Sequence, residues 1–143
     1  MKKTGFTLIE ILIVVSIIGI LAALIVGNFL SARERAADGA MKGELGQLKT
    51  ALQLYYNDNQ SFPSSLPAED QQFSDNGTTY MGSIPRVDYY EQLDSGDDFL
   101  SCSGLERAAD DQKVTLERCD VDESVVETLA SEGRENPYCV CAD

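Results

Sequence analysis

One stretch of the sequence constrains the fold more than any other. From Phe6 to Val26 the only charged residue is Glu10. As an α-helix this segment is about 31 Å long, close to the ~30 Å thickness of a bilayer's hydrocarbon core. A carboxylate at the bilayer centre costs roughly 2.5 to 3.5 kcal/mol, so an acid inside such a segment is retained for a purpose. The sequence therefore predicts a membrane-spanning helix in which Glu10 has a specific role.

The distribution of charge predicts how this helix is oriented. Lys2 and Lys3 precede the apolar run, and residues 54–143 carry twenty acidic residues against five basic ones. The positive-inside rule then places the N-terminus in the cytoplasm and the remainder outside. The chain has a net charge of −13, which disfavours direct binding of nucleic acid or of anionic lipid headgroups.

An ordinary secretory signal peptide is the competing interpretation of the N-terminus. Its apolar core is typically about 7 to 15 residues long and ends at a small-x-small cleavage site. Here the apolar run is longer, and its end, A-A-L-I-V-G-N, is a poor match to such a site. A retained membrane anchor is therefore favoured.

Several classes of enzyme are disfavoured by what the composition lacks. The chain has no His, so Ser/His/Asp triads, Cys/His dyads and His-containing zinc sites cannot be built. There is also no Gly-rich phosphate loop ending in Lys-Ser or Lys-Thr. We expect a protein that is not an enzyme and needs no cofactor.

The N-terminal residues resemble a known signal. Gly5 followed by F-T-L-I-E, after a short basic leader and before a long apolar helix, is similar to the class III signal of type IV pilins and type II secretion pseudopilins. The stretch L-K-T-A-L-Q-L-Y-Y-N-D-N-Q-S-F-P resembles the end of the long pilin helix and its exit turn. The resemblance covers roughly residues 1–63.

This resemblance implies how the chain is processed and divided. A prepilin peptidase would cut after Gly5 and methylate the new N-terminal Phe6. The implied parts are a leader peptide at residues 1–5, a transmembrane and filament-core helix at residues 6–27, and an exported pilin domain at residues 28–143.

The resemblance also implies the partners and the location. The subunits would polymerise into a helical homo-oligomer, with minor pilins and an inner-membrane assembly platform as further partners. The chain would reside in the inner membrane before assembly and in an extracellular pilus or periplasmic pseudopilus afterwards.

Glu10 then acquires a physical explanation. Cleavage after Gly5 would create an amine on Phe6, four residues or about one helical turn before Glu10. A carboxylate in the first turn also faces the positive end of the helix dipole. Resemblance to the family implies that Glu10 meets the Phe6 amine of a neighbouring subunit and sets its register. The alternative is that Glu10 reaches the nearby membrane interface and has no partner.

The exported part has the pattern of an α+β fold. An apolar stripe continues the helix beyond the membrane and ends near Asn57-Asp58-Asn59; it comprises Met41, Leu45, Leu48, Leu52 and Tyr55. We expect a surface connection over residues 60–79, a short helix over residues 124–131 with Val125, Val126 and Leu129 inward, and an antiparallel sheet packed on the long helix. Its strands are expected near Tyr80, 87–90, 99–102, 113–119 and 138–141.

The four cysteines are expected to form two disulfides; they are Cys102, Cys119, Cys139 and Cys141. A bridge between Cys139 and Cys141 would have poor geometry, so the two connectivities that join each of them to Cys102 or Cys119 are favoured. A zinc site formed by all four is the runner-up. The acidic turn at residues 94–98 offers oxygen ligands for calcium, but it lacks EF-hand spacing and is better explained as a solvated turn.

The sequence therefore predicts a structural subunit of a type IV pilus or pilus-like filament. A pseudopilin of a type II secretion system is the nearest alternative. A single-span protein with an extracytoplasmic binding domain is the alternative from another class, and it would retain Met1 to Gly5 in the mature chain.

Overall fold

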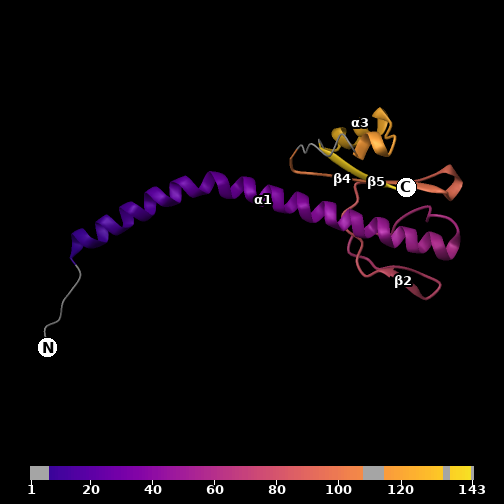
Figure 1. Ribbon diagram of the computed structural model, residues 1–143, viewed down its shortest axis with the longest axis horizontal. Helices are drawn as coiled ribbons and strands as arrows, with labels where there is room; N and C mark the ends of the chain where they lie inside the picture. Colours follow the sequence, from indigo (N-terminus) through magenta and orange to yellow (C-terminus); the bar gives the residue numbers. More distant parts are fainter. Residues whose placement is uncertain (1–6, 108–114, 134–135, 143) are drawn as a thin grey trace. The chain divides into compact units, whose positions relative to one another are not determined.

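The computed structural model describes residues 7–107, 115–133 and 136–142 (Figure 1). Its elements are helix α1, five strands, a short 3-10 helix η1 and helix α3. In chain order they are α1 (Leu8–Asn59), β1 (Phe73–Asp75), β2 (Thr78–Met81), β3 (Tyr89–Leu93), η1 (Asp94–Gly96), β4 (Asp98–Gly104), α3 (Glu123–Ser131) and β5 (Pro137–Cys141). The chain divides into two units, Met1–Arg35 and Ala36–Asp143.

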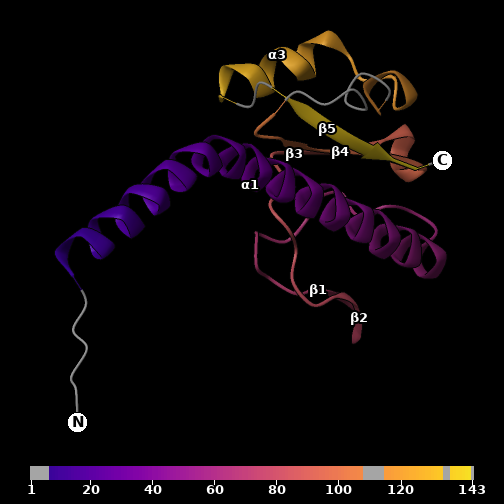
Figure 2. The ribbon, with the colours of Figure 1, turned by 60° about the vertical axis from the view of Figure 1, so that its left-hand side comes forward.

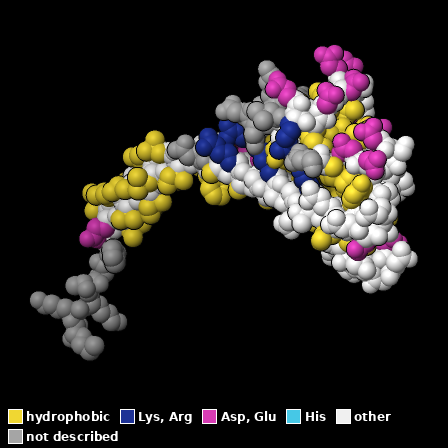
Figure 3. All heavy atoms as spheres, turned by 45° about the vertical axis from the view of Figure 1, so that its right-hand side comes forward, with side chains coloured by type: hydrophobic (Ala, Val, Ile, Leu, Met, Phe, Trp, Pro, Cys, Tyr) yellow, Lys and Arg dark blue, Asp and Glu magenta, His cyan; other side chains and the backbone are white. Residues whose placement is uncertain are grey.

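In the first unit, the large apolar side chains of α1 are exposed around the whole helix. Leu8 is 85% exposed and even the least exposed of them are about half exposed. Figure 3 shows this stretch as a continuous apolar surface. α1 is the one helix in the described part of the chain that is long and apolar enough to cross a membrane. This surface has no partner among the described residues of its unit. Such exposure is expected of a helix that is surrounded by lipid or by other apolar helices.

In the second unit, the remainder of α1 contributes one face to the core. Leu45, Leu48 and Leu52 are fully buried, and Met41 and Tyr55 are half-buried, which confirms the predicted stripe. The helix ends at Asn59, as predicted. Gln60 follows with a left-handed φ of 56°, and its N–H still donates to the carbonyl of Tyr56 at 2.7 Å. Chain reversal at this point returns Phe62 to the core.

Strands β3, β4 and β5 form an antiparallel sheet in that order, with β4 central. In the second unit this sheet lies between α1 and α3 (Figure 2). The side chains of β4 alternate between the two faces. Phe99 packs in the cluster with the α1 leucines, whereas Leu100 and Cys102 pack with Val125 and Leu129 of α3. The predicted α+β arrangement is therefore confirmed.

Strands β1 and β2 form a hairpin. Strand β2 is the one expected near Tyr80, whereas β1 and its pairing with β2 were not predicted from the sequence. They lie on the opposite side of α1 from the three-stranded sheet (Figures 1 and 2). The turn is Asn76-Gly77, with φ of 48° and 83°, and Asn-Gly is the commonest sequence for tight hairpin turns. The hairpin buries Phe73, whose ring stacks on Tyr55 with centroids 5.3 Å apart. The prediction of a plain surface connection over residues 60–79 is thus wrong.

The strand expected over residues 113–119 is also wrong where the structure describes it. Residues 115–118 are helical, and the N–H of Cys119 donates to the carbonyl of Thr115 at 3.1 Å. Lys113 and Val114 lie outside the described residues. Alternation over so few residues is weak, and tertiary packing overrides it: Thr115 is buried, and Leu116 packs against the cluster between the sheet and α3.

Helix α3 matches the expected short helix over residues 124–131. Asp122 caps it by accepting a hydrogen bond from the N–H of Ser124 at 3.1 Å. Val125 and Leu129 are buried as predicted, whereas Val126 is only half-buried.

Candidate functional site

The start of α1 is organised by a reciprocal bond pattern between Thr7 and Glu10. Oε2 of Glu10 accepts hydrogen bonds from the backbone N–H and from the hydroxyl of Thr7, both at 2.8 Å. The N–H of Glu10 lies 3.4 Å from the Thr7 hydroxyl oxygen. With the helix beginning at Leu8, Thr7 is the N-cap and Glu10 the third helical residue, which is the capping-box arrangement.

This arrangement gives the Glu10 carboxylate partners within its own chain. Among the described residues, only its Oε2 accepts hydrogen bonds, so Oε1 is open to a second partner. An ionised carboxylate is an acceptor with two oxygens, and a cationic donor is its strongest partner. From the sequence we predict the Phe6 amine as the partner of Glu10 and do not predict Thr7. The T-x-x-E pattern ahead of an apolar run is a capping-box signature that would have predicted it.

The other N-terminal site residues cannot be placed beside this pair. Gly5 and Phe6, the expected cleavage and methylation positions, lie outside the described residues. The described site is therefore formed by Thr7, Glu10 and the exposed apolar helix that follows them.

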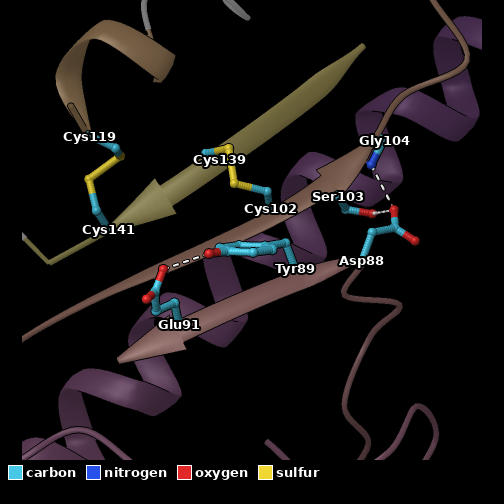
Figure 4. Close-up of a disulfide and its surroundings, with 9 residues drawn as sticks. All are labelled: Asp88, Tyr89, Glu91, Cys102, Ser103, Gly104, Cys119, Cys139 and Cys141. Atoms are coloured by element: carbon cyan, nitrogen blue, oxygen red, sulfur yellow. Dashed lines mark hydrogen bonds between the residues drawn. A yellow bond between two sulfur atoms is a disulfide. The ribbon is translucent and has the colours of Figure 1, made fainter. Parts of the chain in front are cut away.

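The four cysteines are paired as Cys102–Cys139 and Cys119–Cys141, one of the two connectivities favoured from the sequence. Cys102 and Cys139 are register partners on β4 and β5, and Cys119 reaches β5 from the helical turn beside it (Figure 4). All four thiols are thus used in disulfides, which leaves no ligand set for the zinc site considered above.

A carboxylate pins the start of β3 to the end of β4. Oδ2 of Asp88 accepts hydrogen bonds from the Ser103 hydroxyl at 3.1 Å and from the Gly104 N–H at 2.8 Å (Figure 4). Nε of Arg86 lies 3.7 Å from the same oxygen. These bonds hold the start of β3 to β4, the strand that carries Cys102, so they are structural.

Two tyrosines of β3 have raised pKa values for different reasons. The hydroxyl of Tyr89 donates to the Glu91 carboxylate (Figure 4), and this bond, with burial and the nearby negative charge, raises the pKa of Tyr89 to about 12. Burial raises the pKa of Tyr90, and its hydroxyl donates to the carbonyl of Pro63 at 2.7 Å. Both hydroxyls stay protonated near neutral pH and act as donors, Tyr89 within β3 and Tyr90 from β3 to the segment that follows α1.

The acidic turn at residues 94–98 is built into the fold. Oδ1 of Asp98 accepts bonds from the N–H groups of Phe99 at 2.6 Å and Ala142 at 3.1 Å. Gly96 has a φ of 110°, and a Cβ there would lie 2.9 Å from Gln92 Nε2, so the position requires glycine. Among the described residues, no group of three Asp, Glu, Cys or His side chains is placed to hold a metal ion.

Comparison with known proteins points to the same end of the molecule. Residues 1–26 match the family model described as the prokaryotic N-terminal methylation motif. Over 64 residues the chain is 44% identical to type II secretion system core protein G of Pseudomonas aeruginosa, covering 45% of each chain. It is 45% identical over 64 residues to the type IV wide pilus major component PilA4 of Thermus thermophilus, covering 45% of this chain and 49% of that one.

One similarity is longer than these two. Type II secretion system core protein G of Klebsiella michiganensis is 31% identical over 97 residues, which is 59% of this chain and 67% of that protein. The match to the Pseudomonas and Thermus proteins spans less than half of their length. No solved structure matches the chain.

Proposed function

This chain belongs to the family of type IV pilins and type II secretion pseudopilins, and we propose that it is a structural subunit of a pilus or pilus-like filament. The observation that carries the proposal is the Thr7–Glu10 capping box at the start of an apolar helical stretch whose large side chains are all exposed. A helix of this kind needs apolar neighbours on all sides. The membrane supplies them before assembly, and other copies of the helix supply them in a filament.

The proposed processing and parts follow the sequence. A prepilin peptidase cuts between Gly5 and Phe6 and methylates Phe6, residues 6–27 form the membrane and core helix, and residues 28–143 form the exported domain. The N-terminus is cytoplasmic before cleavage. The role is architectural and not enzymatic, and the relatives named above are pilus and secretion-system components.

In this mechanism, Glu10 has two partners at two stages. Thr7 supplies two donors to Oε2, so the carboxylate does not enter the apolar phase without hydrogen bonds. An unpaired buried charge is strongly destabilising, by about 3 to 5 kcal/mol where one partner of a buried pair is removed. Cleavage creates an amine on Phe6. The Phe6 amine of a neighbouring subunit then binds the open Oε1 of Glu10, and this pairing sets the register of the incoming subunit.

The second unit forms the outer surface of the filament. Its C-terminal strand β5 is bonded to β4 and to the turn at residues 115–119 by the two disulfides. Because covalent cross-links resist pulling, they suit a subunit that carries load. Minor pilins and a membrane assembly platform are the further partners we propose.

A pseudopilin of a type II secretion system is the second candidate. It is favoured by the Klebsiella relative, whose similarity spans 97 residues against 64 for the Thermus pilus component. The two candidates predict filaments in different places. Long filaments in the sheared cell-surface fraction, seen by electron microscopy, support a pilus, whereas short filaments confined to the periplasm support a pseudopilus.

Intact mass of the purified protein tests the proposal. We expect loss of residues 1–5 and gain of one methyl group, and a mass increase of four hydrogens after reduction of both disulfides. A chain that retains Met1 to Gly5 would contradict the proposal and favour the anchored binding domain instead.

A further inference from the structure

A groove in the second unit combines acidic rims with apolar walls. It has a volume of about 390 Å³ and lies between α1, the segment that precedes β1 and the segment that follows β2. Met41, Met81, Ile84 and Pro85 supply apolar surface, and Glu44, Glu69 and Asp70 supply carboxylates. No ion pair joins Glu44 or Glu69 to another described residue, and both are exposed.

Arg86 is the one cationic residue among the described residues that line this groove, and its guanidinium binds groups outside the groove. Arg86 donates from Nη2 to the carbonyl of Gly104 at 2.8 Å, and its Nε lies 3.7 Å from Asp88. Its guanidinium therefore serves the β3–β4 connection. The groove lining has three carboxylates against this one guanidinium, and so attracts a cation.

The complementary group is present on the same chain, in the other unit. Arg33 and Arg35 follow the apolar stretch of α1 and are exposed, and neither forms an ion pair with another described residue. Figure 3 shows cationic side chains gathered on α1 just beyond the apolar surface. We call residues 33–35 the arginine segment.

We propose that the groove of one subunit binds the arginine segment of a second copy of this chain. Arginine suits the groove chemically, because its apolar stem packs on the methionines while its planar guanidinium bonds carboxylates in pairs. The groove and the arginine segment are different surfaces, so the contact is heterologous. Contacts of this type generate open helical filaments where the rotation between subunits does not close a ring. The inference rests on the proposed filament function and identifies a second subunit contact outside the apolar core.

A pair of charge reversals tests the contact in the assembling system. The first variant, Glu44→Arg/Glu69→Arg, has a basic groove, and the second, Arg33→Glu/Arg35→Glu, has an acidic segment. When either variant is the only subunit expressed, its groove and its arginine segment carry charges of the same sign. We therefore expect the yield of sheared filaments to fall by about tenfold or more, because the contact becomes repulsive. Glu127→Arg/Glu132→Arg is the matched control for the first variant, since it makes the same change in net charge on exposed residues of α3 and its C-cap.

Co-expression of the two reversed chains separates a contact between copies from one within a chain. In a mixed filament, the basic groove of one chain meets the acidic segment of the other, and the remaining native groove meets native arginines. We expect filaments that contain both chains, detected with two different epitope tags, at a yield near that of the control. A contact within one chain cannot be restored in this way.

The possible results distinguish this inference from the proposed function. Normal filament yield from either reversed chain alone, or failure of the mixed chains to assemble although both are cleaved and reach normal membrane levels, overturns the inference. Both results leave the filament function intact. A wild-type chain that is not cleaved and forms no filament overturns the function itself.

Discussion

Cys102 and Cys139 stand directly opposite each other on β4 and β5, with their Cα atoms 4.1 Å apart and both side chains fully buried. Their disulfide lies in the cluster between the sheet and α3. The second disulfide, Cys119–Cys141, lies farther along β5 and includes one half-buried residue, Cys119. The two cross-links therefore differ in their access to solvent.

This difference predicts the order in which the disulfides are reduced. With increasing reductant under native conditions, Cys119–Cys141 should open first, because a thiolate must reach a sulfur atom to attack it. Alkylation of the free thiols followed by peptide mass mapping would report the order. Simultaneous reduction of both disulfides at the lowest effective reductant concentration would contradict the prediction.

Removing each disulfide should cost similar amounts of stability. The disulfides connect residues 37 and 22 positions apart. Chain entropy then assigns about 4 kcal/mol to the first and about 3 kcal/mol to the second. Denaturant unfolding of the full chain in detergent, with Cys102→Ala/Cys139→Ala and Cys119→Ala/Cys141→Ala, would measure both. A loss well under about 1 kcal/mol for either pair would show that the entropic explanation does not hold here.

Two buried serines on one face of β4 should respond differently to alanine. The hydroxyl of Ser103 donates to Asp88, whereas the buried hydroxyl of Ser101 has no hydrogen-bond partner among the described residues. Ser103→Ala should lower the free energy of unfolding by about 1 kcal/mol, and Ser101→Ala should leave it unchanged or raise it. Each variant serves as the control for the other in thermal or denaturant unfolding. A large loss from Ser101→Ala would show that this hydroxyl is hydrogen-bonded in solution, for example to a buried water.

Tyr89 should titrate later than an ordinary tyrosine. Its pKa is raised to about 12 from the usual 10.0, mainly by donation to Glu91. A raised pKa means that the contribution of this bond to stability is complete below pH 10 and is lost as the pH rises toward 12. Glu91→Gln should bring the titration to lower pH, as measured by the ultraviolet absorbance of tyrosinate. An unchanged titration curve would show that burial alone raises the pKa.

Glu10 variants should separate helix capping from the effect of charge. Glu10→Gln keeps an amide oxygen that can accept from Thr7, because glutamine also completes a capping box. It lacks the negative charge that the Phe6 amine requires. We expect both Glu10→Gln and Glu10→Val to be inserted and cleaved but to give few or no filaments, measured by sheared filament yield against total cellular protein.

Thr7→Val is the matched variant for this comparison. It removes the hydroxyl but keeps the charge of Glu10 and the backbone N–H of residue 7. We expect it to assemble better than either Glu10 variant. If Glu10→Gln assembled as the wild type does, capping and not charge would be the function of this residue.

Elements with strong local signals were predictable from the sequence. The stripe of Leu45, Leu48 and Leu52 follows helical periodicity, and the structure buries all three. The end of α1 at Asn59 was equally clear, because polar residues and then Pro63 cannot continue a helix. The hairpin around Asn76-Gly77 also had a local signal, which the polar composition of its surroundings obscured.

The amino-acid sequence alone establishes two features: an apolar helix with one acid near its start, and an acidic domain with four cysteines after it. Both can be recognised without coordinates, because periodicity, charge and composition are properties of neighbouring residues in the chain. Tertiary packing was needed to establish which cysteines pair, that residues 115–118 are helical, and that Glu44, Glu69 and Asp70 share one groove. Each of these depends on segments that are distant in sequence and are brought together by burial of a common core. No local sequence pattern specifies which distant residues the packing brings together.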